Sequence, residues 1–475
     1  MGKVLSVASE CVPLVKTGGL ADVVGALPGA LAGLGWRMRV LLPGYRGLAA
    51  RLEGAAEVWA GALMGGPARL LAGEAGGVAV LLLEAAHLYD RPGGPYGAGG
   101  DFPDNPERFA ALCQAAVAVA RGELADGWVP DVVHAHDWQG GLAPAYLRLA
   151  GGAVPSVLTV HNIAFQGLAP ADRLAALALP AAEYHAGSLE YYGNISTLKA
   201  GLVHADAITT VSPTYAEELM RPEFGMGLEG VIADRAGVLH GILNGIDTAA
   251  WNPGTDPAIA RTYGGRSLRR KAACRAALLS EFGLGEVPGP LAVLVSRLTH
   301  QKGIDLLAEA VPGFVAAGGG LAVLGTGDAA LEGALRDLAA RHPGRVAVRV
   351  GYDEAASHRM FAGGDAVLVP SRFEPCGLTQ LYGLRYGAVP VVAATGGLND
   401  TVINATPMAL AAGAATGIAF HPTDALALGQ ALRRLVALHA RPATWAAIQR
   451  AGMRQPLGWE VSAATYAGLY AGLVA

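Results

Sequence analysis

Cysteine is scarce in this sequence, and its four cysteines stand far apart, at Cys11, Cys113, Cys274 and Cys376. A structural zinc site needs cysteines or histidines paired a few residues apart, and a disulfide framework needs many cysteines in a short chain. The sequence therefore predicts neither kind of cross-link, as is typical of a cytoplasmic protein.

Long apolar runs and an excess of basic residues are also missing. The longest apolar run, Val78 to Leu83, has the length of a strand, whereas a membrane-spanning helix needs about 20 residues. A net charge of −4 argues against general nucleic-acid binding, which requires a strong basic excess. A predicted strand follows directly after Met-Gly-Lys, so we expect no signal peptide. We expect a globular cytoplasmic protein that binds neither membrane nor nucleic acid.

What the chain does contain is a regular alternation of short apolar runs and longer alanine- and leucine-rich amphipathic stretches. The expected strands are Val4–Ser9, Met38–Leu42, Val78–Leu83, Val132–His136, Val157–His161, Ala207–Val211, Leu291–Val295, Leu321–Leu324, Val346–Val350, Ala366–Val369 and Val389–Ala393. Strand and helix alternating at this spacing indicate parallel sheets covered on both faces, hence an α/β fold. So many strands favour two doubly wound domains over a single sheet.

A turn-forming stretch near the middle of the chain marks the expected domain boundary. Asn244-Gly-Ile-Asp247 leads into Asn252-Pro-Gly-Thr-Asp-Pro257, which is rich in helix-breaking residues. We expect domains at residues 1–245 and 246–455. Residues 456–475 are expected to form a helix that packs back on the first domain.

The turn Lys16-Thr17-Gly18-Gly19 lies between the first expected strand and a helix expected from Asp22. Glycine permits positive φ and a close backbone approach to a ligand, and a helix start attracts anions. Lys16 adds a positive charge. The turn is therefore a candidate site for phosphate or sugar hydroxyls, although a tight turn with a solvated lysine explains the same residues.

Histidines follow two other expected strands. His134 and His136 are two residues apart, so they share one face of a strand. They indicate a metal site, a polar wall for a hydroxyl-rich substrate, or polar residues that satisfy one another. His161 and Asn162 follow the next strand, next to aromatic Phe165, a combination that suits sugar binding.

Charged residues follow strands in the second half. Arg297 and Lys302 flank an expected strand-to-helix turn, where both can reach one anion. Glu374 lies at a turn bounded by proline and glycine, either facing sugar hydroxyls or capping a helix. Gly325–Ala330 is similar to a dinucleotide fingerprint. Thr395-Gly-Gly-Leu398 repeats the Thr-Gly-Gly-Leu of the first half.

Together these motifs resemble the family of bacterial glycogen synthases and plant starch synthases, glycosyltransferase family 5. The resemblance runs from residue 4 to about residue 470, in the family's order. The motifs are Lys16-Thr-Gly-Gly-Leu20, His134-Ala-His-Asp-Trp138, His161-Asn162, Asn244-Gly-Ile-Asp247, Ser296-Arg-Leu-Thr299 with Gln301-Lys-Gly303, and Glu374-Pro-Cys-Gly-Leu-Thr-Gln380.

The resemblance implies two Rossmann-like domains facing a cleft, known as the GT-B fold. It also implies a retaining transfer of glucose from ADP-glucose to the non-reducing end of an α-1,4-glucan, which elongates glycogen. ADP-glucose and the glucan are then the partners. The first domain is expected to hold the acceptor and the second the nucleotide sugar.

By motif match, the expected catalytic residues are Glu374, Arg297, Lys302, His161 and Asp137. Arg297 and Lys302 are expected to hold the diphosphate and Glu374 the transferred glucose. The expected substrate-binding residues are Lys16, Gly18, Gly19, Asp22, Asn162, Asn244, Ser296, Gly351, Tyr352, Cys376, Gly377, Leu378 and Thr379.

The chain departs from the family pattern just before its second Thr-Gly-Gly-Leu, where Ala394 replaces the usual basic residue and Asn399 a usual alanine. Metal-dependent transferases commonly hold a cation with an Asp-X-Asp triplet, which this sequence lacks. Since lysine, arginine and helix N-termini can stabilise a departing diphosphate instead, we expect no metal and no cofactor.

Other interpretations remain open at this point. A nucleotide-sugar epimerase of the same architecture keeps the fold without the polymer. An NAD-dependent oxidoreductase rests on Gly325–Ala330, and a metal-dependent hydrolase on His134 and His136. A glycan-binding protein without activity explains the strand-end charges least well.

Overall fold

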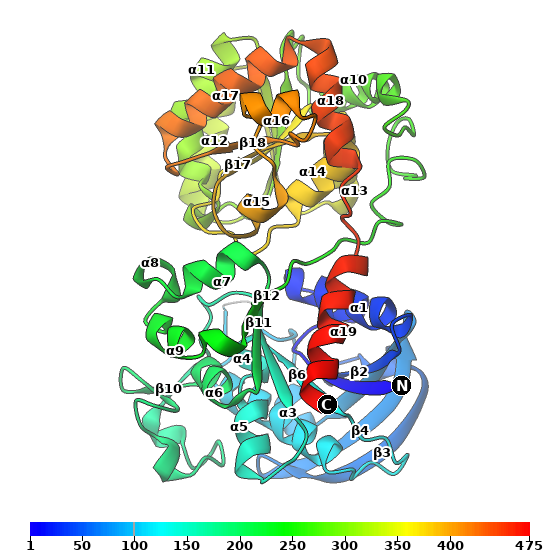
Figure 1. Cartoon of the computed structure of the whole chain (residues 1–475), viewed down its shortest axis with the longest axis vertical. Coiled ribbons are helices and arrows are strands. Elements are labelled where there is room, and N and C mark those ends of the chain that lie inside the picture. The colour runs from blue at the N-terminus through cyan, green and yellow to red at the C-terminus, as the bar shows by residue number, and fades with distance from the viewer. Residues whose placement is uncertain (98–99) are drawn as a thin grey trace. The chain divides into compact units, whose positions relative to one another are not determined.

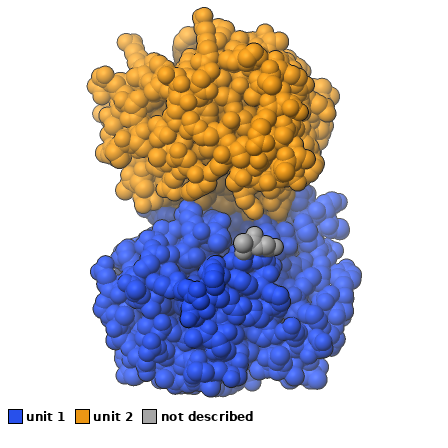
Figure 2. All heavy atoms as spheres, turned by 180° about the vertical axis from the view of Figure 1, so that it is seen from behind, with its two compact units in different colours: residues 1–244, 459–475 blue, residues 245–458 orange. Residues whose placement is uncertain are grey.

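The computed structural model describes residues 1–97 and 100–475. The chain forms two compact units, which Figure 2 shows in blue and orange. Unit 1 is Met1–Asn244 together with Trp459–Ala475, and unit 2 is Gly245–Gly458. In sequence, unit 2 is therefore an insertion between the two parts of unit 1.

Unit 1 is built on a nine-stranded sheet with the order β12-β11-β7-β6-β1-β2-β5-β4-β3. Its strands are β1 (Gly2–Val7), β2 (Trp36–Pro43), β3 (Glu53–Leu63), β4 (Gly66–Ala75), β5 (Val78–Glu84), β6 (Val132–His136), β7 (Ser156–Val160), β11 (Ala207–Thr210) and β12 (Leu239–Gly241). Neighbours pair in parallel, except that β4 is antiparallel to both β3 and β5. A small antiparallel sheet contains β8 (Leu168–Pro170), β9 (Glu190–Tyr191) and β10 (Asn194–Ser196).

The helices of unit 1 come mainly from its first 244 residues, and the last comes from the C-terminal segment. They are α1 (Gly19–Ala32), α2 (Ala86–Tyr89), α3 (Asn105–Ala120), α4 (Asp137–Gly140), α5 (Leu142–Leu149), α6 (Thr197–His204), α7 (Pro213–Leu219), α8 (Pro222–Gly225), α9 (Glu229–Asp234) and α19 (Glu460–Val474). Helix α1 begins at Gly19, three residues before the expected start at Asp22.

Helix α19, red in Figure 1, packs in the core of unit 1. Trp459, Ala463, Tyr466 and Tyr470 form its buried stripe at helical spacing and contact the same cluster as residues of β1, β2 and α1. The Tyr470 hydroxyl lies 2.7 Å from Nδ1 of His134 on β6. The C-terminal helix is therefore part of the hydrophobic core that covers the first sheet.

Unit 2 is built on a six-stranded parallel sheet with the order β15-β14-β13-β16-β17-β18. Its strands are β13 (Leu291–Val295), β14 (Gly320–Gly325), β15 (Val346–Val350), β16 (Ala366–Val369), β17 (Val389–Ala393) and β18 (Ile418–Phe420). Its helices are α10 (Lys271–Glu281), α11 (Leu307–Ala316), α12 (Ala329–Arg341), α13 (Glu354–Gly363), α14 (Thr379–Tyr386), α15 (Gly396–Thr401), α16 (Pro407–Ala411), α17 (Ala425–His439) and α18 (Pro442–Met453).

Side chains of the unit 2 sheet alternate between two hydrophobic cores. Ala292 and Leu294 belong to one core, whereas Leu291 and Val293 belong to the other. Both faces of the sheet are thus covered, which explains why its strands are apolar throughout rather than alternating.

Both sheets have the strand order of a doubly wound Rossmann fold. Numbered from β13, the unit 2 strands run 3-2-1-4-5-6, and in unit 1 the parallel strands β1, β2, β5, β6, β7 and β11 follow the same order. The α/β prediction is confirmed. In such sheets a ligand crevice opens at the carboxyl ends of the strands where the order reverses. These switch points lie between β1 and β6 and between β13 and β16.

All eleven expected strands exist, but others were not predicted. The largest omission is the hairpin of β3 and β4, whose strand β3 is mostly exposed and rich in alanine and glycine, so it presents no apolar run. The strands β8, β9, β10, β12 and β18 have only two or three residues each.

A buried lysine joins two helices of unit 2. The Nζ atom of Lys271 donates to the backbone oxygens of Phe361 (2.9 Å), Ala362 (2.7 Å) and Tyr386 (3.2 Å). These carbonyls end α13 and α14, where cations are favoured. Lys271 thereby holds α14, whose first turn borders the candidate site. Within the described residues, no helix is both long and apolar enough to cross a membrane.

Candidate functional site

The expected site residues follow strands on both sides of each switch point. In unit 1, residues 9–19 follow β1 and Asp137 follows β6. In unit 2, Arg297 and Lys302 follow β13, and Glu374 follows β16. Each unit thus gathers charged groups where its sheet is built to receive a ligand.

Asp137 joins the ends of β6 and β7. Its carboxylate accepts hydrogen bonds from the backbone N–H groups of His161 (2.7 Å) and Asn162 (3.3 Å). Burial raises the pKa of Asp137 to about 7, although these two bonds lower it. Its φ of 50° is left-handed, an unfavourable backbone conformation for a residue other than glycine. Such strain often accompanies a functional role.

His161, which is partly exposed, ends a histidine chain that continues inward to buried His136. Its Nε2 lies 3.0 Å from Nδ1 of His136, and Nε2 of His136 lies 3.0 Å from Oγ of Ser6. Burial lowers the pKa of His161 to about 3 and that of His136 well below its usual value. Both imidazoles are therefore neutral at physiological pH, and each can donate one hydrogen bond and accept one.

His134 and His136 satisfy polar groups inside unit 1. His134 contacts the hydroxyls of Tyr470 (2.7 Å) and Thr159 (2.5 Å), and both histidines are buried. The described residues contain no group of three or more histidine, cysteine, aspartate or glutamate side chains suited to a metal ion. Of the three interpretations of this pair, the structure supports mutual satisfaction over a substrate-facing wall.

The Lys16 turn differs from the expected open phosphate site. The carboxylate of Glu10 accepts hydrogen bonds from the backbone N–H groups of Thr17 and Gly18, and Lys16 Nζ lies 2.7 Å from the Asp22 carboxylate. The N–H groups of Thr17 and Gly18 and the Lys16 ammonium are therefore occupied. Gly18 has an extended φ of −155°, and Gly19 begins α1, so the expected positive φ is absent here.

In unit 2 the structure brings two candidates into direct contact. Lys302 Nζ lies 2.5 Å from Oε2 of Glu374, and the hydroxyl of Ser371 donates to the same oxygen at 2.8 Å. The Glu374 side chain is only 9% exposed and that of Lys302 17%. An oriented carboxylate and an ammonium thus lie together at the β13–β16 switch point.

Arg297 contrasts with Lys302. Its side chain is exposed, and among the described residues it forms neither an ion pair nor a hydrogen bond. Ser296, just before it, donates from Oγ to the Arg297 carbonyl oxygen at 3.1 Å. The guanidinium is therefore available to an anion without breaking a protein contact.

The second Thr-Gly-Gly turn supports the loop that carries Glu374. A Cβ atom at Gly396 would lie 2.0 Å from the Glu374 carbonyl oxygen, and one at Gly397 would lie 2.3 Å from that of Cys376. The Gly397 N–H donates to the Glu374 carbonyl at 3.1 Å. Only glycine permits this approach, so the two Thr-Gly-Gly turns have different structural roles.

Gln380 holds the same loop from the other side. Its amide donates to the carbonyls of Cys376 (3.0 Å) and Gly377 (2.9 Å), and Gly377 has a positive φ of 73°. Helix α14 begins at Thr379 after Leu378, and no side chain of the described residues caps its start. Its first N–H groups can therefore meet an anion.

The remaining candidates are spread over both units. Asn162 Oδ1 accepts from the Ala164 N–H (3.0 Å), whereas the buried Oδ1 of Asn244 has no partner among the described residues. Gly351 has a φ of 139°, and Tyr352 next to it is 77% exposed. The Tyr352 hydroxyl donates to Glu354 at 2.8 Å, and an aromatic ring so exposed is accessible for stacking.

The fingerprint-like turn after β14 is filled by the protein itself. Asp328 accepts from the N–H groups of Ala330 (2.8 Å) and Leu331 (3.2 Å), and Glu332 accepts from Gly327 (3.1 Å). Carboxylates thus occupy the start of α12, where a pyrophosphate would need open donors. This arrangement contradicts the dinucleotide interpretation.

Two site residues were missed in the sequence. The Gln139 amide donates to the Tyr96 hydroxyl at 2.7 Å, and burial, then the charges of Glu10 and Asp137, raise the Tyr96 pKa. Tyr96 therefore lies near both carboxylates. It belongs to a glycine- and proline-rich segment with no strand signal, whereas Gln139 follows Asp137 closely enough to have been included.

Asp137→Asn is expected to raise the thermal unfolding midpoint at pH 8. The native pKa is about 7, above the unfolded value of about 3.9, so wild-type stability falls as pH rises between these values and stays reduced above pH 7. An asparagine oxygen accepts the same two N–H bonds without a charge. The shift of about three units corresponds to at most about 4 kcal/mol, while activity should fall because the carboxylate is lost.

Asp126→Asn provides the control for this pH dependence. Burial raises the pKa of Asp126, but hydrogen bonds from Trp128 and Arg39 outweigh it and leave the pKa lowered. Stability from this group is present at high pH and is lost on acidification, so Asp126→Asn should destabilise at pH 8. A lower midpoint for Asp137→Asn than for wild type at pH 8 would contradict the assignment.

Two family models match the chain. The starch synthase catalytic domain matches residues 3–234, and glycosyl transferases group 1 matches residues 289–437. The chain is 66% identical to a glycogen synthase of Cereibacter sphaeroides, covering 100% of this chain and 99% of that protein. It is 60% identical to a glycogen synthase of Paracoccus denitrificans, covering 100% of both.

Solved structures give the same picture. The catalytic domain of starch synthase IV from Arabidopsis thaliana, bound to ADP and acarbose, aligns with a TM-score of 0.89 at 29% identity and covers 100% of both chains. Sucrose-phosphate synthase from Thermosynechococcus elongatus aligns with a TM-score of 0.62 at 19% identity over 100% of this chain and 99% of that one, which supports the fold alone.

Proposed function

Because this chain belongs to the family of glycogen and starch synthases, we propose that it transfers α-D-glucose from ADP-glucose to the non-reducing end of an α-1,4-glucan, with retention of configuration. The observation that carries the proposal at the site is the Lys302–Glu374 pair at the β13–β16 switch point. The epimerase alternative finds no support among the relatives.

Unit 2 is proposed to hold the donor. Arg297, Lys302 and the start of α14 supply positive charge for the diphosphate, and the exposed ring of Tyr352 stacks on the adenine. The ADP in the starch synthase IV structure supports ADP over UDP as the nucleotide. Ala394 provides no cation beside α15, so Arg297 and Lys302 supply the positive charge that stabilises the leaving diphosphate.

Unit 1 is proposed to hold the reacting glucose and the acceptor. Asp137 and neutral His161 offer oxygen and nitrogen atoms to sugar hydroxyls, with Asn162 beside them. Lys16 breaks its ion pair with Asp22 and then supports the diphosphate. A cytoplasmic location is part of the proposal, because the four cysteines, all in the described ranges, are buried and unpaired.

The transfer is proposed to occur on one face of the sugar. The acceptor 4-hydroxyl forms a bond to C1 as the bond from C1 to the phosphate oxygen breaks. The electron pair of that bond goes to ADP, and the hydroxyl proton passes to the leaving phosphate. Glu374 is held by Lys302 and Ser371, which suits an oriented stabilising charge better than a nucleophile. No metal is needed where fixed cations stabilise the diphosphate.

The test is glucosyl transfer to glycogen from ADP-glucose or UDP-glucose with EDTA present. Polymer-bound glucose and released nucleoside diphosphate are both measured. We expect incorporation from ADP-glucose that EDTA does not reduce. Equal use of UDP-glucose would contradict the donor assignment, loss of activity in EDTA would contradict metal independence, and no transfer from either donor would contradict the function.

A further inference from the structure

An arginine that the proposed reaction does not use joins the two loops of unit 2 that carry Lys302 and Glu374. Arg372 lies two residues before Glu374, in the loop after β16. Its guanidinium donates from Nη1 to Oδ1 of Asp305 (2.7 Å) and from Nη2 to Oδ2 (2.6 Å). Asp305 lies three residues after Lys302, in the loop after β13. The pair therefore connects the loops within a few residues of both charged groups.

Arg372 also holds the short turn His300–Lys302, the lysine turn. Its Nη1 donates to the backbone carbonyl of His300 at 2.8 Å, and its backbone N–H donates to the Gln301 carbonyl at 2.9 Å. These carbonyls belong to the two residues directly before Lys302. A guanidinium offers its donors in a rigid planar fork. Because one fork binds both a carboxylate and a carbonyl, it fixes the lysine turn in a single orientation.

Two further contacts show how closely the loops pack. The Gln301 amide donates to the carbonyl of Phe373 at 3.2 Å. A Cβ atom at Gly303 would lie 2.0 Å from the carbonyl oxygen of Pro370, and Gly303 has a positive φ of 67°. Only glycine permits this approach. The loop after β16 therefore contacts the lysine turn on both sides of its lysine.

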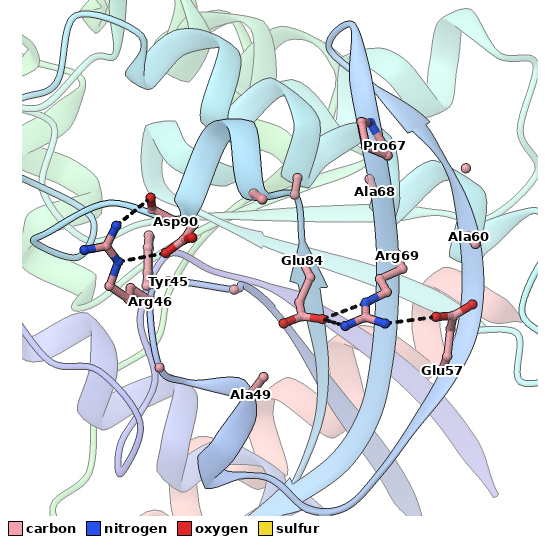
Figure 3. Close-up of a pocket in the computed structure, with 15 residues that line it drawn as sticks. Tyr45, Arg46, Ala49, Glu57, Ala60, Pro67, Ala68, Arg69, Glu84 and Asp90 are labelled. Atoms are coloured by element: carbon pink, nitrogen blue, oxygen red, sulfur yellow. Dashed lines mark hydrogen bonds and ion pairs between the residues drawn. The ribbon is translucent and has the colours of Figure 1, made fainter.

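An arginine of unit 1 offers a contrast. Figure 3 shows Arg69 on β4, which lies between Glu84 (2.7 Å) on β5 and Glu57 (3.4 Å) on β3. These three strands are neighbours that backbone pairing already joins. The pairing of β13 with β16, in contrast, ends at Val293 and Val367. Contacts made by the loops themselves therefore set the spacing between the two loops.

The Arg372–Asp305 pair is charged but open to water. The pKa of Asp305 is lowered, first by the hydrogen bonds from Arg372, and the pKa of Arg372 is raised, first by its hydrogen bonding to Asp305. The two side chains are 38% and 28% exposed. An ion pair so accessible to solvent contributes little to folding stability. Activity is therefore the more sensitive measure of what the pair does.

We propose that Arg372 and Asp305 position the lysine turn against the Glu374 loop, so that ammonium and carboxylate meet in one fixed geometry. Both are positioning residues, without a substrate contact of their own. The proposal rests on the proposed function, which assigns the diphosphate to Lys302 and the glucosyl group to Glu374. A displacement of about 1 Å in either loop can cost about a hundredfold in rate, because the transition state needs both charges in place.

The test is a double-mutant cycle of Arg372→Met and Lys302→Met, with kcat for transfer from ADP-glucose to glycogen as the readout. A positioning residue acts through the group that it positions, so the two losses should not multiply. We expect Arg372→Met to lower kcat about tenfold to a hundredfold in wild type and less than about threefold in the Lys302→Met background. Arg372→Lys keeps the charge without the fork and should recover only part of kcat.

Arg359→Met is the matched control. Arg359 forms a two-bond pair with Glu281, both bonds 2.8 Å, in the same unit, and its side chain is 31% exposed. It should leave kcat unchanged in both backgrounds. Asp305→Asn serves if Arg372→Met does not fold. It leaves the bonds from Arg372 to the two carbonyls, so we expect a smaller loss with the same dependence on Lys302.

Thermal unfolding of the same variants gives a readout without turnover. Lys302→Met leaves the Glu374 carboxylate unpaired, and its destabilising effect should be smaller once Arg372 is replaced, since a displaced turn weakens the ion pair. Three results would overturn the positioning role: equal kcat losses in both backgrounds, a kcat of Arg372→Met equal to that of Arg359→Met, or equal destabilisation by Lys302→Met with and without Arg372. A wild type inactive with every donor contradicts the proposed function, while the unfolding cycle still tests the positioning role.

Discussion

Replacing Glu374 with glutamine should lower kcat at least about a hundredfold. The carboxylate is nearly buried, and Lys302 and Ser371 fix its orientation. Its negative charge is therefore preorganised before any substrate binds. Glutamine has the same shape and can keep the Ser371 bond, but it cannot stabilise a positively charged glucosyl group. Initial rates with saturating ADP-glucose and glycogen measure the effect.

The same substitution also breaks a largely buried ion pair. Leaving Lys302 unpaired can destabilise unit 2 by up to about 3–5 kcal/mol, so the unfolding midpoint has to be measured beside the rate. Glu281→Gln is the matched control, because Glu281 pairs with Arg349 and Arg359 in the same unit. It should lose stability and keep its turnover. Wild-type turnover in Glu374→Gln would remove Glu374 from the mechanism.

Arg297→Met is expected to separate activity from stability. The exposed guanidinium forms no ion pair or hydrogen bond within residues 1–97 and 100–475, so its loss should leave the unfolding midpoint within the small range of surface substitutions. If it holds the diphosphate in the transition state, kcat/KM should fall by about a hundredfold or more, or about 3 kcal/mol. Thermal unfolding and initial rates on the same preparation measure both quantities.

Two further variants sharpen this result. Arg336→Met removes another exposed arginine of unit 2, which pairs with Glu332, and should change neither quantity. Arg297→Lys keeps the charge without the planar fork, so it should recover only part of the activity. An Arg297→Met enzyme with normal kcat/KM would contradict its role at the diphosphate.

The strands were predictable because parallel strands covered on both faces carry uninterrupted apolar runs. The β3–β4 hairpin escaped detection for the opposite reason, since the side chains of β3 are mostly exposed and small. Sequence reasoning therefore found the strands that carry the candidate site and missed the hairpin at the edge of the first sheet.

The chemical types at the strand ends were also predictable, but their partners were not. A lysine and a glutamate 72 positions apart give no sign in the sequence that they will meet, as Lys302 and Glu374 do. Likewise, nothing in the Lys16 turn shows that Glu10 will accept its N–H groups. Both Thr-Gly-Gly triplets lie at a helix start, yet only the second packs against the Glu374 loop, because what lies against each comes from distant residues.

The place of α19 in the fold sets the order in which the two units can be completed during synthesis. Unit 2 is continuous, so all of its residues have been synthesised before Trp459 is added. The first sheet, although made earlier, lacks its covering of Tyr466 and Tyr470 until all of unit 2 has been made. Domains generally fold as units during synthesis, yet here the half made first is the half completed last. The Tyr470 hydroxyl, one of the two that His134 contacts, likewise arrives only after unit 2 has been made.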